Sequence, residues 1–404
     1  MFSINKKFRV CIIGSGFGGI STLINLSNLL KNNSLVEIFL ISNSDYFLFT
    51  PLLHEVATYE VSPENIVYPI EKLKESINNF TFLKRKVNTI DFDNRKVITD
   101  IDRINYDYLV LSLGSVTNFY GNKNLEKNSF TLKTLEDAVI IRENIKKIFI
   151  KKNELKIVVA GGGATGLELI GNIKFYIDKL KVLFKNNIPV KLILVEKFDK
   201  LLQEFKDDEF SNVSLNRLKD LGIEVLLETE VIDFYNNKIT FKRNNRIEKE
   251  IIDIDMLIWT AGIKPNPLVL NLDLEKNSNG RIIVDDFLNP LNYPEVYVIG
   301  DIAYNPNSKE NYTTAQMAIQ QAENVANNIY SKTRLFKYSK PFKYNHKGNL
   351  VTIGKNFGIS NIKGYKFKGF YGWLLWKIIH LIKLNDNKNK LNVLFDWLSN
   401  QIYL

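Results

Sequence analysis

Residues 8–21 read FRVCIIGSGFGGIS, and this stretch decides the fold of the amino-terminal part of the chain. The apolar run before Gly14 is typical of a buried parallel strand. Gly14, Gly16 and Gly19 then fit the pattern G-x-G-x-x-G, which makes a tight turn, lets the backbone approach a pyrophosphate and lets a helix pack on the strand. Helical spacing follows, and VEIFLIS at 36–42 predicts a second strand. The stretch therefore predicts a βαβ unit.

The same pattern recurs 147 residues later, where residues 155–166 read LKIVVAGGGATG and VKLILVE follows at 190–196. Apolar runs predict further strands at 106–114, 254–262 and 296–303, and helical spacing predicts helices at 132–150 and 314–330. Two complete βαβ frames, with strands and helices alternating elsewhere, predict an α/β protein with two doubly wound, Rossmann-like dinucleotide-binding domains.

The residue that ends the second strand differs between the two copies. Glu196 ends VKLILVE, where a carboxylate accepts hydrogen bonds from an adenosine ribose and repels a 2′-phosphate. This favours NADH over NADPH in the second copy, with a solvated strand-end glutamate as the alternative. The first copy has Ser42, followed by Asn43, which could still hydrogen-bond a ribose.

Composition narrows the class of protein. The 404 residues are 45% hydrophobic and 24% charged, ordinary values for a globular protein of two or three domains. Cys11 is the only cysteine, which excludes a disulfide framework and a dithiol pair, and three histidines leave little material for a metal centre, so we expect no metal. The predicted strand begins near residue 8, so we expect no signal segment and a bacterial protein that faces the cytoplasm.

The basic excess lies at the carboxyl end. Net charge is +10, and residues 331–404 hold 14 Lys and Arg against two acids. Such a tail, rich in aromatics, suits nucleic acid or an anionic membrane. Its apolar stretch 370–384 is shorter than the ~20 residues that span a bilayer, so we predict an interfacial helix with Trp373 and Trp376 on one lipid-facing side, aided by nearby lysines. A helix pair packed on the protein itself or on a dimer partner is the alternative.

Several motifs make the whole chain resemble one family. They are YFLFTPLL at 46–53, WTAG at 259–262, Gly300-Asp301, AQMAIQQ at 315–321 and GWLLW at 372–376. With the two glycine turns, they resemble the two-dinucleotide-binding flavoprotein reductases, and most closely type II NADH dehydrogenase, the non-pumping NADH:quinone oxidoreductase.

This resemblance implies an organisation and an activity. The second domain is inserted in the first, with an FAD-binding domain at 1–125 and 282–335, an NADH-binding domain at 126–281 and a membrane-anchoring region at 336–404. The implied cofactor is non-covalent FAD, the substrates are NADH and a membrane quinone, and no metal or nucleic acid is needed. The implied location is the cytoplasmic face of a bacterial inner membrane, bound peripherally to anionic lipid, with a homodimer left open.

The resemblance also implies site residues. Glu168 would reach the nicotinamide, unless it is a first-turn glutamate that favours the helix dipole. Gln316 and Gln320 share a helix face that would meet a quinone carbonyl, unless they are surface glutamines. The residues implied for FAD are Gly14, Ser15, Gly16, Phe17, Gly18, Gly19, Ser42, Asn43, Gly114, Asp301, Ala315 and Gln316. Those implied for NADH are Gly161, Gly163, Gly166, Glu168 and Glu196.

Rival functions differ in what they require. Sulfide:quinone oxidoreductases and disulfide reductases need paired cysteines, so a single Cys11 disfavours both. A soluble NAD(P)H reductase with a protein acceptor would not need the basic aromatic tail. A slow NADH-sensing flavoprotein stays open, and steady-state turnover with a soluble quinone separates these alternatives.

Overall fold

The computed structural model describes residues 7–31, 35–77, 79–244, 248–334 and 338–402. Two compact units divide the chain. The first comprises residues 1–47, 68–116 and 263–345, and the second comprises residues 48–67, 117–262 and 346–404. Both units are therefore discontinuous in sequence.

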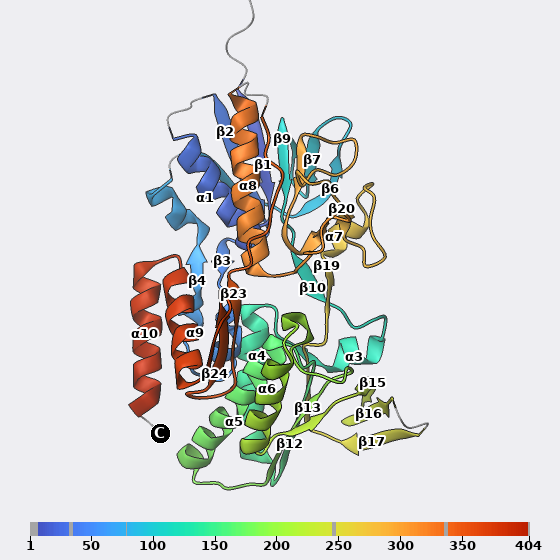
Figure 1. The fold of residues 1–404 in the computed structure, drawn as a ribbon, viewed down its shortest axis with the longest axis vertical. Helices are drawn as coiled ribbons and strands as arrows, with labels where there is room; N and C mark the ends of the chain where they lie inside the picture. The colour runs from blue at the N-terminus through green and yellow to red at the C-terminus, as the bar shows by residue number, and fades with distance from the viewer. Residues whose placement is uncertain (1–6, 32–34, 78, 245–247, 335–337, 403–404) are drawn as a thin grey trace, which may run out of the picture. The chain divides into compact units, whose positions relative to one another are not determined.

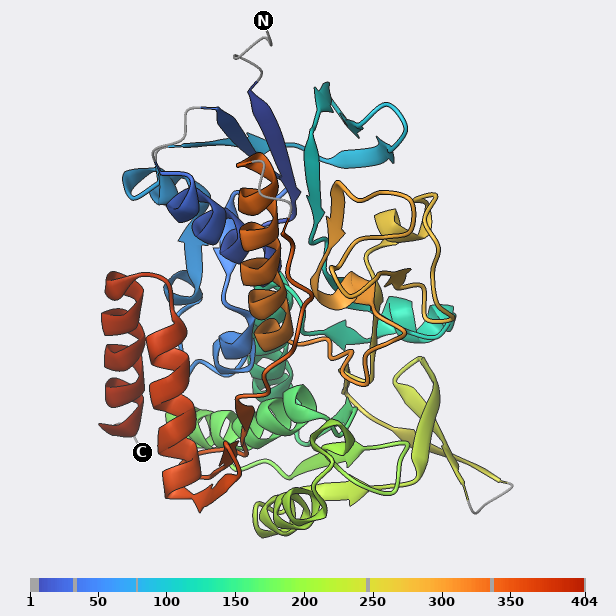
Figure 2. The ribbon, with the colours of Figure 1, turned by 45° about the horizontal axis from the view of Figure 1, so that its top comes forward.

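A five-stranded parallel sheet forms the core of the first unit, in the order β21-β9-β1-β2-β5. Its strands are β1 (Phe8–Ile13), β2 (Val36–Ser42), β5 (Phe80–Lys84), β9 (Tyr108–Leu111) and β21 (Val296–Val298). Most residues of the inner strands β9, β1 and β2 are buried, as their continuous apolar sequences predict. Helices α1 (Phe17–Leu29) and α8 (Ala315–Thr333) pack against each other beside this sheet (Figures 1 and 2).

The position of β21 confirms the predicted insertion. This strand pairs with β9, although the strands of the second sheet lie between the two in sequence. A small antiparallel sheet, which the sequence did not predict, completes this part of the first unit. Its strands are β6 (Val87–Asp91), β7 (Lys96–Thr99) and β8 (Arg103–Asn105).

The second unit repeats the architecture with a parallel sheet in the order β11-β18-β12-β13-β14. Its strands are β11 (Phe130–Thr131), β12 (Leu155–Ala160), β13 (Val190–Val195), β14 (Glu224–Leu226) and β18 (Met256–Trp259), and its main helices are α4 (Leu135–Lys151), α5 (Ala164–Phe184) and α6 (Asp208–Asp220). A capping box between Thr134 and Asp137 begins α4. An antiparallel sheet of β15 (Thr229–Tyr235), β16 (Lys238–Arg243) and β17 (Lys249–Asp253) is appended to it and appears in yellow in Figure 1.

The carboxyl-terminal part of the second unit begins with a sheet that the sequence did not predict. Its antiparallel strands are β23 (Gly348–Thr352), β24 (Gly358–Ile362) and β25 (Tyr365–Gly369). The predicted helices follow as α9 (Phe370–Lys383) and α10 (Asn387–Ile402), which lie side by side in red in Figures 1 and 2. Strand β23 packs against both α5 and α9, so the tail is built onto the second unit.

The two units differ in extent from the predicted cofactor domains. Residues 48–67 cluster with the second unit rather than the first, and residues 346–404 join the second unit instead of standing apart. The predicted ranges assign each segment to a ligand or to the membrane: FAD to 1–125 and 282–335, NADH to 126–281 and the membrane to 336–404. This assignment stays a prediction.

Candidate active site

The first glycine turn has the shape that a dinucleotide requires. A Cβ atom on Gly14 would lie 2.4 Å from the Ser112 carbonyl oxygen, and one on Gly19 would lie 1.8 Å from the Gly14 carbonyl oxygen. A Cβ on Gly16 would meet no atom within 4 Å. Gly14 and Gly19 therefore close the turn tightly, while Gly16 leaves its backbone open to a ligand at the start of α1.

The residue equivalent to Glu196 is Ser42, by strand register. Ile13 pairs with Ile41 before Gly14, and Ala160 pairs with Val195 before Gly161. In the second unit, Glu196 Oε2 accepts a hydrogen bond of 2.5 Å from the Gly162 N–H. In the first unit, the hydroxyls of Ser15 and Ser42 lie 2.9 Å apart and both residues are buried. A neutral hydroxyl pair thus takes the place of the carboxylate.

The remaining residues predicted for FAD lie around the end of the first sheet. Ser115 donates a 2.5 Å hydrogen bond to Asp301 Oδ2, and Gly300 N donates to Gln321 Oε1 at 2.7 Å. Phe17 packs edge-on against Phe47, with ring centroids 5.1 Å apart, and Ile299 Cδ1 would lie 3.0 Å from a Cβ on Gly18. Asn43, directly after β2, is exposed. Gly114 has φ +66°, and Ala315 is the first residue of α8.

Gln316 and Gln320 lie on α8, as predicted, and both contact the segment that follows it. The Tyr344 hydroxyl donates to Gln316 Oε1 at 2.9 Å. Gln320 exchanges two hydrogen bonds with the backbone of Asn345, at 3.0 and 2.9 Å. Their amides therefore also hold the chain near 344–345, a contact that the sequence pattern did not predict.

The second glycine turn matches the first. Gly161 has φ +112°, and a Cβ on Gly166 would lie 1.9 Å from the Gly161 carbonyl oxygen. Helix α5 begins at Ala164, directly after Gly163. The turn places backbone N–H groups and the positive end of the helix dipole where an anion can bind.

Glu168 is buried among groups of the tail. Its Oε1 accepts hydrogen bonds from Trp376 Nε1 at 2.9 Å and from Thr352 N at 3.4 Å, and its Oε2 lies 3.6 Å from His54 Nδ1. Burial raises the pKa of Glu168 to about 8, so this carboxyl holds a proton at neutral pH. The alternative of a first-turn glutamate is wrong, because α5 has no acid in its first turn.

His54 faces Glu168 as a neutral ring. Burial, and then the charge of Lys377, lowers the pKa of His54 to about 3. The contact between His54 and Glu168 is therefore not an ion pair, despite its distance. Among the described residues, His54 Nε2 has no hydrogen-bond partner.

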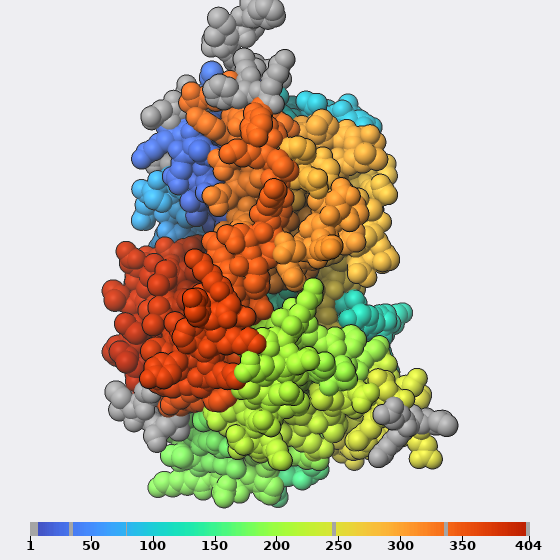
Figure 3. Space-filling model, viewed as in Figure 1, coloured from blue at the N-terminus to red at the C-terminus, as the bar shows by residue number. Residues whose placement is uncertain are grey.

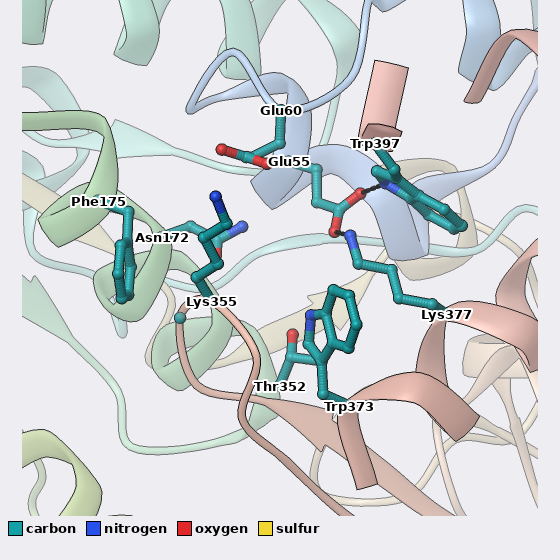
Figure 4. A pocket seen from close by; sticks show the side chains of 10 residues that line it. Glu55, Glu60, Asn172, Phe175, Thr352, Lys355, Trp373, Lys377 and Trp397 are labelled. Carbon is teal, nitrogen blue, oxygen red and sulfur yellow. Dashed lines mark hydrogen bonds and ion pairs between the residues drawn. The ribbon is translucent and has the colours of Figure 1, made fainter. Parts of the chain in front are cut away.

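A second buried carboxylate, Glu55, lies on α2 (Leu53–Val56) and was missed from the sequence. Its Oε1 forms an ion pair with Lys377, and its Oε2 accepts a 2.7 Å hydrogen bond from Trp397 Nε1. Figure 4 shows this pair at the edge of a pocket that Trp373, Phe175 and Lys355 also line. The signal in the sequence was Lys377, which lies between Trp376 and Ile378 in a mostly apolar run.

These contacts correct the prediction for the tail. Trp376 does not share an outward face with Trp373: it is 1% exposed and bonded to Glu168, and Lys377 is buried rather than directed toward lipid. The alternative, helices packed on the protein itself, holds for this inner side. The outer side stays apolar and exposed. Its large residues are Phe370, Tyr371, Leu374, Ile378, Ile382, Leu391, Leu394, Phe395 and Leu398.

The sequence matches two family descriptions. Residues 8–322 match the pyridine nucleotide-disulphide oxidoreductase family, and residues 346–403 match the NDH2 C-terminal domain. The "Probable NADH dehydrogenase" of Dictyostelium discoideum is 32% identical over 98% of this chain and 90% of that protein. A type II NADH:quinone oxidoreductase of Mycobacterium tuberculosis is 28% identical over 98% of this chain and 87% of its own length.

Solved structures agree on the fold. The NDH2 of Plasmodium falciparum in complex with NADH gives a TM-score of 0.89 at 22% identity, and the match covers 98% of this chain and 99% of that one. The sulfide:quinone oxidoreductase of Aquifex aeolicus gives 0.79 at 20% identity, covering 95% and 92%. At these identities the likeness concerns the arrangement of the chain alone.

Proposed function

We infer that this chain, which belongs to the pyridine nucleotide-disulphide oxidoreductase family, is a type II NADH:quinone oxidoreductase that oxidises NADH and reduces a quinone. The observation that carries this conclusion is one chain holding both glycine turns and an NDH2 C-terminal domain. The single cysteine, buried in β1, argues against sulfide or disulfide chemistry.

The family implies FAD, and we propose that the first glycine turn holds it without a covalent bond. The open face of Gly16 suits the pyrophosphate, and Asp301, held by Ser115, suits the ribityl chain. Ser15 and Ser42 would meet the adenosine ribose, with Asn43 beside them. Backbone near Gly114 and residues from Phe17 to Gly19, with Ala315 and Gln316, complete the proposed site. When bound, the flavin supplies hydride acceptance and electron transfer, and the protein positions it and excludes water.

NADH is proposed to bind at the second glycine turn, with Glu196 facing the adenosine ribose. Glu196 is fixed by hydrogen bonds from the N–H groups of Gly162 and Phe198. We propose that Glu168 acts on the nicotinamide side of this site. Its buried, protonated carboxyl would offer the carboxamide a hydrogen-bond donor rather than a charge.

Replacing Glu196 by glutamine should narrow the preference for NADH over NADPH by about tenfold or more, because a carboxylate repels the 2′-phosphate and a neutral amide does not. The amide keeps an oxygen for the Gly162 N–H, so the turn should survive. The measurement is the ratio of kcat/KM for the two nucleotides. Glu224→Gln, which removes one exposed charge from the ion pair with Lys191, serves as the control. An unchanged ratio in Glu196→Gln would show that Glu196 does not face the ribose.

We propose that quinone is reduced at the face of α8 that carries Gln316 and Gln320. Their amides lie four residues apart and are fixed by Tyr344 and Asn345, so their donors and acceptors have defined directions. A quinone carbonyl needs such a donor as its oxygen gains electron density.

Gln320→Ala should slow quinone reduction by about tenfold or more while leaving flavin reduction by NADH within about twofold, since one amide donor contributes on this scale. Stopped-flow absorbance times the two half-reactions separately, first with anaerobic NADH and then with a soluble quinone. Asn327→Ala removes an exposed amide from the same helix and is the matched control. If the variant instead loses flavin reduction by NADH and keeps quinone reduction, the quinone does not bind at this face of α8.

For the tail, we propose peripheral docking of α9 and α10 on anionic lipid at the cytoplasmic face of a bacterial membrane. Among the described residues, no helix is both long and apolar enough to cross a bilayer. The exposed apolar side of α9 and α10, flanked by lysines such as Lys388, supports the surface mode. In Figure 3 the red segment that contains α9 and α10 lies at the surface of the face shown. Packing of this segment against a second copy of the chain is the alternative to lipid docking.

A further inference from the structure

The carboxylate of Glu204 lies at the amino-terminal end of α5. Its Oε1 accepts a 3.1 Å hydrogen bond from the Ala164 N–H, the first amide of the helix. Around Gly163, the three atoms nearest to a built Cβ are all from this carboxylate, the closest at 3.3 Å. The equivalent position in the first unit, Gly16, is open to 4 Å. The second glycine turn is thus covered by the carboxylate of Glu204, whereas the first is open at Gly16.

The backbone beside Glu204 is anchored, whereas its side chain is not. Leu202 N donates to the Gly162 carbonyl oxygen at 2.9 Å, and Leu201 N donates to Ser211 Oγ at 3.0 Å. Both leucines are 1% exposed. Glu204 itself is exposed, with no ion pair or other hydrogen bond in the described residues beyond the one to Ala164. Rotation of this side chain into solvent would therefore free the helix end without moving the loop.

We propose that Glu204 determines the affinity of the second unit for its dinucleotide by occupying the place of the pyrophosphate until the ligand displaces it. The inference rests on the proposed binding of NADH at this turn. The second glycine of the pattern is where the backbone meets the pyrophosphate, and the helix amides are its donors. Glu204 uses one of those donors and covers that glycine, so a carboxylate and a pyrophosphate cannot both be there.

The cost to the ligand follows from the population of the uncovered state. The apparent dissociation constant equals the intrinsic one divided by the fraction of molecules in which the helix end is free. A side-chain cap on a helix amide favours the covered state over the free state by a ratio of about three to ten. Displacement is a step before chemistry, so it should appear in KM for NADH and not in kcat.

The test uses ADP-ribose, which has the pyrophosphate but no nicotinamide, and NADH with the complete protein. Equilibrium dissociation constants are compared for the wild type, Glu204→Gln, Glu204→Ala and the control Glu154→Gln. Glu154 is an exposed glutamate that precedes β12, at the end of the strand away from Gly161, so its variant loses the same charge elsewhere.

Glu204→Ala should bind both ligands about three- to tenfold more tightly, with a lower KM for NADH and an unchanged kcat. Glu204→Gln should also tighten binding but by less, because its amide oxygen can still accept from Ala164. Glu154→Gln should stay within about twofold of the wild type. Equal affinity in the wild type and Glu204→Ala, or weaker binding in the variant, would overturn the proposed role of Glu204 but not the binding of NADH at this turn. If none of the four proteins binds ADP-ribose, the assignment of NADH to this turn fails, and the inference fails with it.

Discussion

Replacing Lys377 by methionine should lower the free energy of unfolding of the second unit by about 3–5 kcal/mol, because Glu55 then stays buried without its cation. The side chains of Glu55 and Lys377 are 3% and 10% exposed, so water cannot replace the lost partner. The Trp397 N–H would remain as a donor to Glu55, but one neutral hydrogen bond does not balance a buried charge. Thermal and denaturant unfolding, followed by tryptophan fluorescence, measure the loss.

Two further variants make this result specific. Combining Lys377→Met with Glu55→Gln removes both charges and should recover at least half of the lost stability, since the pair then becomes neutral. Lys388→Met changes an exposed lysine of α10 and should have little effect. If the single variant is as stable as the wild type, or if the double variant recovers nothing, the buried pair does not stabilise the protein as its geometry indicates.

Replacing Ile382, Leu391 and Phe395 together by glutamate should weaken binding to anionic liposomes by about a hundredfold or more. These side chains are 66%, 68% and 72% exposed, so they contribute little to the folded core. Each would lose about 1.5–3 kcal/mol if its burial in lipid were complete, and each new carboxylate is repelled by the anionic surface. Vesicle flotation over a range of lipid concentrations gives the change.

The variants for this experiment must leave the inner side of the tail intact. Truncation before Phe370 would remove Trp376 and Trp397, the donors to Glu168 and Glu55, and would damage the second unit as well as the outer face. Tyr235→Glu with Ile251→Glu is a better comparison, because both residues are exposed and belong to the appended sheet of β15 and β17. Lipid binding that survives the triple variant would argue against docking through α9 and α10.

Local patterns in the sequence predicted most of the framework. Each βαβ unit is specified over a few dozen residues, so the glycine turns and the bounds of β1, β2 and β13 follow from periodicity and from glycine geometry. The same holds for α9 and α10 as helices. The register of β1 with β2, and of β12 with β13, then places Ser42 and Glu196 at equivalent positions.

Contacts between distant parts of the chain could not be predicted in this way. Trp376 and Glu168 are 208 residues apart, and Trp397 and Glu55 are 342 apart. An amphipathic pattern shows that α9 has two sides, but it does not say whether tryptophan or isoleucine faces inward. The indole N–H decides, because it can satisfy a buried carboxyl and an aliphatic side chain cannot. Glu204 was missed for a related reason, since only the folded loop brings it to Ala164.

The raised pKa of Glu168 makes folding a proton-uptake reaction. An unfolded chain ionises this carboxyl near pH 4.5, whereas the native protein keeps it protonated to about pH 8, so between these values the native state carries one more proton. Because the native pKa is the higher one, the contribution of this group to stability is complete below about pH 4.5 and is lost as the pH rises through 8. The packing of the tail over Glu168, which excludes water from the carboxyl, thus couples the attachment of the last helices to the acidity of the solution.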